Sequence, residues 1–176
     1  NPVSFYAIGK LASENYMRIF SKFGISAIAL RLFNVYGPGQ NMDNLKQGML
    51  SIYMAQAINS NAITVKGSLE RFRDFVYIDD VVDAFDKAYQ KTNENDFFGV
   101  YNICSGFKTH VKELIDLIKK HHYSPVKINV IDGTPGDQFG IFGSSWRAKV
   151  DLSWQATEVL DTGLYKMMQW AINQKK

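Results

Sequence analysis

Residues 25–33 of the chain read Ile-Ser-Ala-Ile-Ala-Leu-Arg-Leu-Phe, an almost continuous apolar run. A short apolar run rich in branched side chains is typical of a strand that is buried on both faces, the pattern of a parallel sheet. A polar loop follows, from Asn34 through Gly37-Pro38-Gly39 to about Leu45. Strands of this kind occur mainly in α/β proteins, so this stretch favours that fold class.

The segment before this run has helical spacing. From Phe5 to Phe23, apolar residues recur at intervals of three and four, which predicts one amphipathic helix. Ser4 stands at the N-cap position, and Gly24 follows the last turn, where a C-terminal glycine is common. The chain therefore opens with a predicted helix that leads directly into the parallel strand.

The rest of the chain alternates helical and strand patterns. We expect helices at about 47–58, 79–89, 109–121 and 160–173, and short strands at 63–65, 72–77, 99–103 and 127–131. No repeat, low-complexity tract or flexible linker separates them. Mixed elements of these lengths indicate an α/β or α+β protein.

Composition excludes several classes of protein. The chain has 176 residues, of which 46% are hydrophobic and 21% charged, as in globular proteins rather than disordered, collagenous or coiled-coil ones. The single cysteine excludes an internal disulfide framework and a thiolate-built zinc site. A dispersed net charge of +3 gives no argument for nucleic-acid binding, and the apolar runs are too short to span a membrane. We expect a cytoplasmic protein that binds no metal.

Tyr6 and Lys10 are the first candidates for chemistry. Residues four apart share one face of a helix. A lysine ammonium stabilises the deprotonated form of a nearby phenol, and a tyrosine so activated can act as a general base. The alternative is a surface pair on an amphipathic helix, and the spacing alone favours this alternative.

Five motifs in order along the chain change that balance. They are SFYAIGKLASEN at 4–15, RLFNVYGPGQ at 31–40, RDFVYIDDV at 73–81, VYNI with Ser-Gly at 100–106, and Gly136-Asp137 followed by Gly163-Leu164. This set resembles the extended short-chain dehydrogenase/reductase superfamily, and within it the NAD-dependent epimerase/dehydratase family. On these motifs the closest resemblance within the family is to UDP-glucose 4-epimerases.

The resemblance implies a fold and a domain division. The implied fold is α/β: the C-terminal part of a Rossmann-like doubly wound sheet plus the small α/β substrate-binding domain. Residues 1–35 would be the catalytic helix and strand of the dinucleotide-binding domain, and 36–176 mainly the nucleotide-sugar-binding domain, with residues of about 72–90 returning to the Rossmann part. No Gly-rich dinucleotide fingerprint occurs in the sequence. We therefore expect the C-terminal half only of such an enzyme.

The resemblance also implies a reaction. An NAD-dependent nucleotide-sugar epimerase interconverts sugars of the UDP-glucose/UDP-galactose type at C4 through a 4-keto intermediate. The alternatives are a 4,6-dehydratase or decarboxylase of the same superfamily, or a non-catalytic truncated binding module. We expect this chain alone to be inactive. We expect the intact protein to use NAD and a UDP-sugar and to form a homodimer through the first helix.

Roles for single residues follow from the same resemblance. Tyr6 would be the base and Lys10 would hold the nicotinamide ribose, while Phe33 and Tyr36 would line the cofactor cleft. The implied substrate-binding residues are Asn34, Asn44, Leu45, Met49, Arg73 and Asp137.

Three of these substrate residues have a structural alternative. Asn34 could cap a turn, Arg73 could pair with a nearby aspartate, and Asp137 could be a turn residue. The resemblance implies that Arg73 binds the diphosphate of the nucleotide sugar as a clamp, and Arg71 is a rival for this role. Many relatives carry an arginine where this chain has Thr134, which leaves a second clamp in doubt unless Arg147 or Arg71 replaces it.

Overall fold

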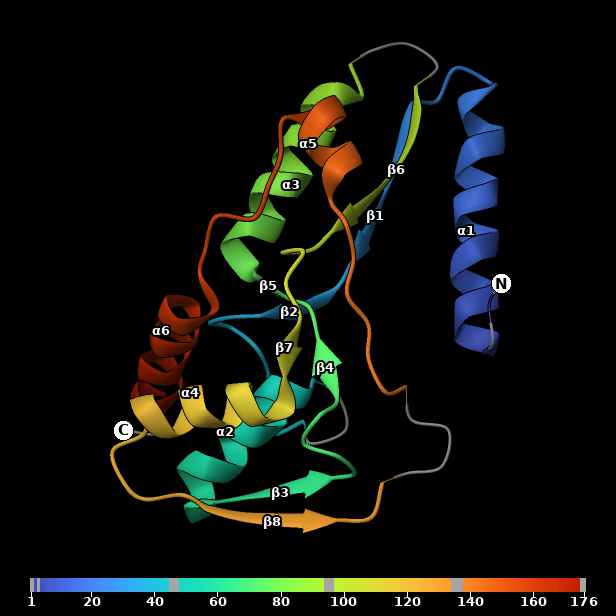
Figure 1. Cartoon of the computed structure of the whole chain (residues 1–176). Helices are drawn as coiled ribbons and strands as arrows, with labels where there is room; N and C mark the ends of the chain where they lie inside the picture. Colours follow the sequence, from blue (N-terminus) through green and yellow to red (C-terminus); the bar gives the residue numbers. More distant parts are fainter. Residues whose placement is uncertain (1, 3, 45–47, 94–96, 134–137, 175–176) are drawn as a thin grey trace.

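The chain forms an α/β structure built largely from pairs of parallel strands (Figure 1). A computed structural model describes residues 2, 4–44, 48–93, 97–133 and 138–174. Three parallel pairs join β1 (Ala27–Leu32) to β6 (Phe98–Ile103), β2 (Asn34–Tyr36) to β5 (Phe75–Tyr77) and β3 (Ala62–Lys66) to β8 (Lys127–Ile131). A short antiparallel pair joins β4 (Phe72–Arg73) to β7 (Thr109–His110). The predicted α/β class with parallel strands is confirmed.

The helices alternate with the strands in sequence. They are α1 (Phe5–Ser21), α2 (Met49–Ser60), α3 (Ile78–Lys91), α4 (Val111–His121), α5 (Trp146–Leu152) and α6 (Leu160–Asn173). The periodicity predicts five of them to within a few residues. The apolar spacing does not predict the short helix α5, because seven residues hold too few apolar positions to establish a helical period.

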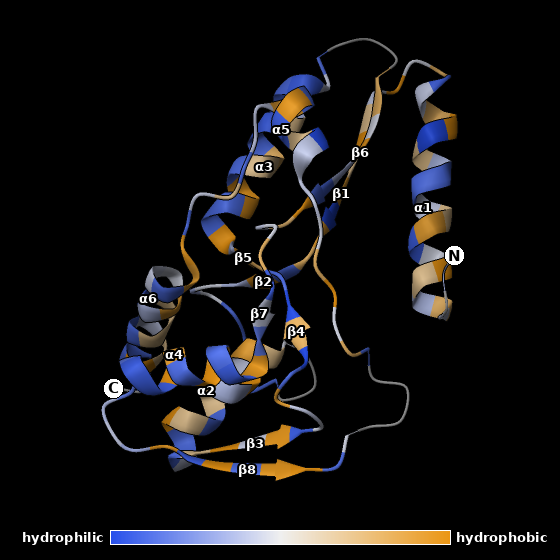
Figure 2. Cartoon of the chain, viewed as in Figure 1, coloured by the Kyte–Doolittle hydropathy of each residue, from blue (hydrophilic) through white to orange (hydrophobic). Residues whose placement is uncertain are grey.

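Two hydrophobic clusters divide the interior. One lies between α2, α4, α6 and the strands β2, β3 and β5, and its members with no exposed surface include Met54, Ile63 and Leu164. The other joins α3, α5 and β6 around Trp154, with apolar residues of β1 packed against it. Figure 2 shows apolar colours along β3, β8 and much of β6, and both apolar and hydrophilic patches on the helices.

Strand β1 departs from its prediction. The run at 25–33 was expected to be buried on both faces, but the residues of β1 are half-buried or exposed, and Leu32 is 42% exposed. The reason is that β1 has one partner strand among the described residues, β6, while α1 packs beside the pair (Figure 1). The prediction of two-sided burial is therefore wrong.

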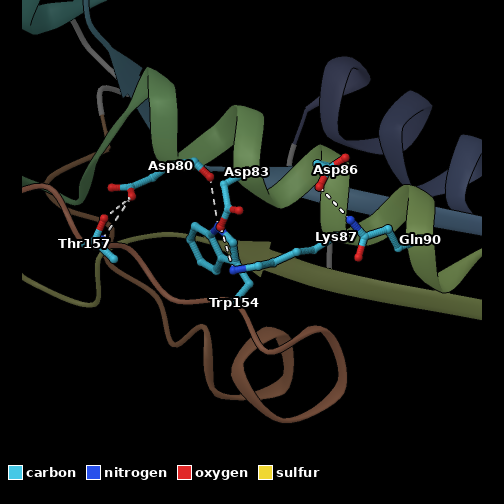
Figure 3. Close-up of polar contacts among 7 residues, drawn as sticks. All are labelled: Asp80, Asp83, Asp86, Lys87, Gln90, Trp154 and Thr157. Atoms are coloured by element: carbon cyan, nitrogen blue, oxygen red, sulfur yellow. Dashed lines mark hydrogen bonds and ion pairs between the residues drawn. The ribbon is translucent and has the colours of Figure 1, made fainter.

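The first turn of α3 is tied to the chain that follows α5 (Figure 3). The buried Asp80 carboxylate accepts hydrogen bonds from the Thr157 hydroxyl at 2.8 Å and the Glu158 backbone N–H at 3.0 Å. The Asp80 carbonyl accepts the indole N–H of Trp154 at 2.8 Å. These bonds fix α3, and with it β5, against the C-terminal segment.

Within the described ranges, no helix combines the length and the apolar character that crossing a bilayer needs.

Candidate functional site

Tyr6 and Lys10 lie together on the first turns of α1. The helix begins at Phe5 because Ser4 caps it, its hydroxyl oxygen accepting the Ala7 N–H at 3.1 Å. The Lys10 Nζ lies 5.5 Å from the centroid of the Tyr6 ring, and the tyrosine side chain is 75% exposed. The predicted neighbours on one helix face therefore meet in space.

A cleft of about 650 Å³ opens between α1 and the end of β1. Tyr6 and Lys10 form one wall, and Phe33 and Asn34, which follow β1, form another. The remaining lining residues are Pro2, Ala7, Leu11, Glu14, Arg31, Leu32, Asn102 and Ile141. The cleft sits at the carboxyl end of a parallel strand, where open α/β sheets place their ligands.

An ion pair joins α1 to β1 along this cleft. The Arg31 guanidinium donates from Nε to Glu14 Oε1 and from Nη2 to Glu14 Oε2, both at 2.7 Å. This hydrogen bonding, more than the charge alone, lowers the pKa of Glu14 below its ordinary value. The pair is bidentate, which fixes the two side chains in distance and orientation.

Asn34, the first residue of β2, is held by the residue that directly precedes β5. Its side-chain Nδ2 donates to the Asp74 carbonyl at 2.9 Å, and its backbone N–H donates to the same oxygen at 3.2 Å. The Asp74 carboxylate is fully buried and accepts the Ser105 hydroxyl, at 2.7 Å, with the backbone N–H groups of Ser105, Gly106 and Gly143. The Asp74 carboxylate thus ties together two loops, at Ser105–Gly106 and at Gly143, behind Asn34.

A second hollow, of about 580 Å³, also has Asn34 in its lining. Three cationic residues line it: Lys66, Arg71 and Arg73. The other lining residues are Asn34, Gly48, Met49, Ile52, Tyr53, Gln56 and Thr64. A wall with three cations and few anions is suited to a ligand that carries phosphate.

The two arginines of this hollow are anchored differently. Arg73 donates from Nη1 to the Phe72 carbonyl at 2.7 Å and from Nη2 to the Gln138 carbonyl at 3.0 Å, so its guanidinium is oriented by backbone. Arg71 is almost completely buried and donates from Nε to the Ser68 carbonyl at 3.3 Å. Both of the clamp residues weighed from the sequence therefore line the same hollow.

Some predicted site residues lie elsewhere or outside the described chain. Tyr36 is 2% exposed and packs against Phe75 and Tyr77, in the core rather than in the cleft with Tyr6. Asn44 is exposed and does not line either hollow. Leu45 and Asp137 lie outside the described residues.

Several residues of the site were not predicted from the sequence. Glu14 and Arg31 line the cleft, Lys66 lines the second hollow, and Asp74 holds Asn34. For Glu14 a signal existed, because it follows Lys10 by four positions and so shares the face of Tyr6 and Lys10. The partners of Arg31 and Asp74 come from distant segments, and no local pattern identifies such partners.

Comparisons with known proteins agree with this geometry. A sequence model of the NAD dependent epimerase/dehydratase family matches residues 1–104. The dTDP-4-dehydro-6-deoxyglucose reductase of Escherichia coli is 34% identical over 93% of this chain and 51% of its own length. A putative UDP-glucose 4-epimerase of Methanocaldococcus jannaschii is 30% identical over the whole chain and 56% of its own length. The chain thus spans about half the length of these relatives.

Solved structures are similar over the whole chain. The UDP-glucose 4-epimerase of Thermotoga maritima, crystallised with UDP-glucose, superposes with a TM-score of 0.88 at 29% identity, over 100% of this chain and 56% of that one. A UDP-glucuronic acid 4-epimerase from Bacillus cereus, in complex with UDP-glucuronic acid and NAD, gives 0.86 at 26% identity, over 100% and 55%. The described fold is therefore that of these enzymes, with its Rossmann-like portion.

The comparisons correct two predictions. The prediction that the chain is the C-terminal half only of such an enzyme is contradicted by the family match, which starts at the first residue and ends at residue 104. The prediction that UDP-glucose 4-epimerases are the closest likeness is also wrong, because the reductase shares 34% identity and the putative 4-epimerase 30%. Motifs common to a whole family do not rank its members.

Proposed function

Because this chain belongs to the NAD-dependent epimerase/dehydratase family, we propose that it carries the catalytic tyrosine–lysine pair and the nucleotide-sugar site of an enzyme that acts at C4 of the sugar. Tyr6 and Lys10 are the catalytic residues of this proposal. Asn34, Met49 and Arg73 bind the substrate.

One observation carries the proposal: Asn34 lines both hollows. One of these hollows is also lined by Tyr6 and Lys10, and the other by three cationic side chains. The chemical groups of a nucleotide sugar match these two hollows, because the sugar carries hydroxyl groups at one end of the molecule and the anionic diphosphate lies in the middle. Its sugar reaches Tyr6 when its diphosphate lies among Lys66, Arg71 and Arg73.

The residues of the cleft fit the nicotinamide end of NAD. Lys10 supplies N–H donors for ribose hydroxyl oxygens, and Leu11, Phe33 and Ile141 supply apolar surface for the ring. When bound there, NAD supplies the acceptor and donor of hydride. Tyr36, buried in the core, does not belong to this wall.

The protein's own part in the reaction is proton transfer and positioning. Tyr6 removes the proton of the C4 hydroxyl while hydride leaves the same carbon, and it returns the proton when the 4-keto sugar is reduced. Lys10, 5.5 Å from the Tyr6 ring centroid, stabilises the phenolate that this requires. Asn34 and the cations hold the substrate so that C4 faces Tyr6.

We consider two candidate reactions for a member of this family. We propose 4-epimerisation of a UDP-sugar of the glucose/galactose type as the first candidate, supported by the similarity to the Thermotoga epimerase. The 34% identity to a dTDP-4-dehydro-6-deoxyglucose reductase favours a second candidate, reduction of a 4-keto nucleotide sugar. A 4,6-dehydratase or a decarboxylase uses the same tyrosine–lysine pair, and in each case we expect this chain alone to give no turnover.

Domain division and assembly also belong to the proposal. We assign residues 1–35 and the returning segment at about 72–90 to the dinucleotide-binding side, and the remainder mainly to the nucleotide-sugar side. We expect a homodimer through the exposed apolar residues of α1, among them Phe5, Ile8 and Phe20. Sedimentation velocity over a wide concentration range measures this, and a monomer at all concentrations contradicts it.

Isothermal titration calorimetry with UDP tests the substrate site on this chain. We expect Arg73→Ala to weaken UDP binding at least tenfold, which corresponds to about 1.4 kcal/mol. Arg71→Ala tests the rival clamp. Arg18→Ala is the matched control, because Arg18 is an exposed arginine of α1 whose side chain bonds to Asn15.

The results separate the candidates. UDP binding that Arg73→Ala weakens and Arg18→Ala leaves unchanged supports a nucleotide-sugar site, and a preference for dTDP over UDP favours the reductase-like candidate. Binding without turnover, even in the intact protein, supports a non-catalytic module. No binding of either nucleotide contradicts the proposed site.

A further inference from the structure

Three residues of α1 face the cleft in one row: Tyr6, Lys10 and Glu14. Each is four residues from the next, so Lys10 has a helical neighbour on both sides. One neighbour is the phenol that it serves in the proposed function. The other is a carboxylate of opposite charge, at the spacing that permits an ion pair along the helix.

Glu14 and Tyr6 therefore compete for the same ammonium. An exposed lysine and glutamate four residues apart attract each other by about 0.2–0.5 kcal/mol. In the described structure, Lys10 lies over the Tyr6 ring at 5.5 Å, and Glu14 is bound by Arg31. Glu14 is thus occupied by a stronger partner from another element.

Arg31 has the geometry to win this competition. Its two donors meet the two carboxylate oxygens at 2.7 Å each, and a bidentate guanidinium pair is stronger and more directional than a contact with one ammonium. The arginine is fixed in β1, where Arg31 pairs in register with Asn102 of β6. The position of its backbone is therefore set by the strand pair rather than by α1.

We propose that Arg31 is a positioning residue that holds Glu14 away from Lys10 and so leaves Lys10 to Tyr6. This inference rests on the proposed function, because it assigns the tyrosine–lysine contact a purpose. It adds to that function a role for charge pairing. Two cations, Lys10 and Arg31, and one anion, Glu14, line the cleft near Tyr6, and the bidentate bond pairs Glu14 with Arg31 rather than with Lys10.

Arg31 thus has two separable effects. It ties α1 to β1, and it shields Lys10 from Glu14. If only the tie matters, loss of Arg31 and loss of Glu14 are equivalent. If shielding matters, loss of Arg31 is harmful only while Glu14 is present, and a second substitution at Glu14 reverses the harm.

Nuclear magnetic resonance of this chain, labelled with isotopic lysine, distinguishes the two. The Lys10 side-chain signal, assigned by its loss in Lys10→Gln, is expected to carry a ring-current displacement that Tyr6→Leu removes. Arg31→Met is expected to reduce that displacement, and Arg31→Met with Glu14→Gln to restore it. Glu14→Gln alone and the control Arg18→Met leave it unchanged.

Each outcome decides a point. Reduction in Arg31→Met with recovery in the double variant supports the shielding. An unchanged signal in Arg31→Met, or a double variant no better than the single one, overturns it and leaves the proposed function standing. A Lys10 signal that is insensitive to Tyr6→Leu contradicts the tyrosine–lysine contact itself, and with it the proposed function.

Discussion

Asn34 reaches the Asp74 carbonyl oxygen twice, with its side-chain Nδ2 and with its backbone N–H. This double contact orients the carboxamide in the wall that the two hollows share. It also links the site to Asp74, whose buried carboxylate holds the loops at Ser105 and Gly143. The side chain that lines both the proposed sugar site and the proposed phosphate site is therefore oriented by the backbone just before β5, the partner strand of β2.

Asn34→Asp tests that contact. The new carboxylate oxygen faces the Asp74 carbonyl, so an attraction becomes a repulsion between two acceptors. We expect the free energy of unfolding to fall by about 1–3 kcal/mol, measured by urea denaturation, and UDP binding to weaken. Asn34→Ala, which removes the bond without adding charge, is the control and should cost less. A variant as stable as the parent would show that the contact contributes nothing.

Two helical glycines give opposite predictions for alanine. At Gly9 in α1, an added Cβ meets nothing within 4 Å, so Gly9→Ala should stabilise the chain by about 1 kcal/mol through helix propensity. At Gly163 in α6, an added Cβ would clash with the Tyr36 hydroxyl oxygen, so Gly163→Ala should destabilise the chain. Thermal and urea unfolding of the pair measures both, and equal effects would contradict the packing described at Tyr36.

Cys104 should react slowly with thiol reagents in the native chain. It is fully buried beside Asp74, and burial, followed by the nearby carboxylate, raises the pKa of its thiol to about 11. We expect iodoacetamide labelling to proceed at the rate of unfolding and to become fast in urea. Because this is the only cysteine in the sequence, the modified fraction reports directly on opening behind Phe33. Fast native labelling contradicts the burial.

The contact between α4 and α6 should weaken in acid. Lys120, and then His121 at 2.6 Å, hydrogen-bond to Asp161 and lower the pKa of its carboxyl group. A lowered folded-state pKa contributes stability above the ordinary value near 3.9, and that contribution is lost as pH falls through the lowered pKa. The difference in unfolding midpoint between the parent and Asp161→Asn should therefore be present at neutral pH and vanish in strong acid. A difference that does not change with pH would contradict this.

Local sequence patterns predicted the helices, but they did not predict the contacts that distant segments make with one another. Apolar spacing located α1, α4 and α6, because a helix forms from contacts within a few residues. The site contacts at Glu14 and Asn34 depend on partners 17 and 40 residues away, which no local pattern identifies. Tyr36 shows the same limit. Its motif suggested the cleft, but β2 carries the ring into the core between Phe75 and Tyr77.

The parallel pairing of β1 with β6 also bears on how the cleft comes into being. Ala27 pairs with Phe98 and Leu32 with Ile103. The β1–β6 pair therefore forms only after the long segment between the two strands has become ordered. Closing such a loop costs entropy before any contact repays it, and chains with distant pairings fold slowly for this reason. A nascent chain that ends before Ile103 therefore carries Tyr6 and Lys10 but lacks the complete β6 strand that pairs with β1 beside them.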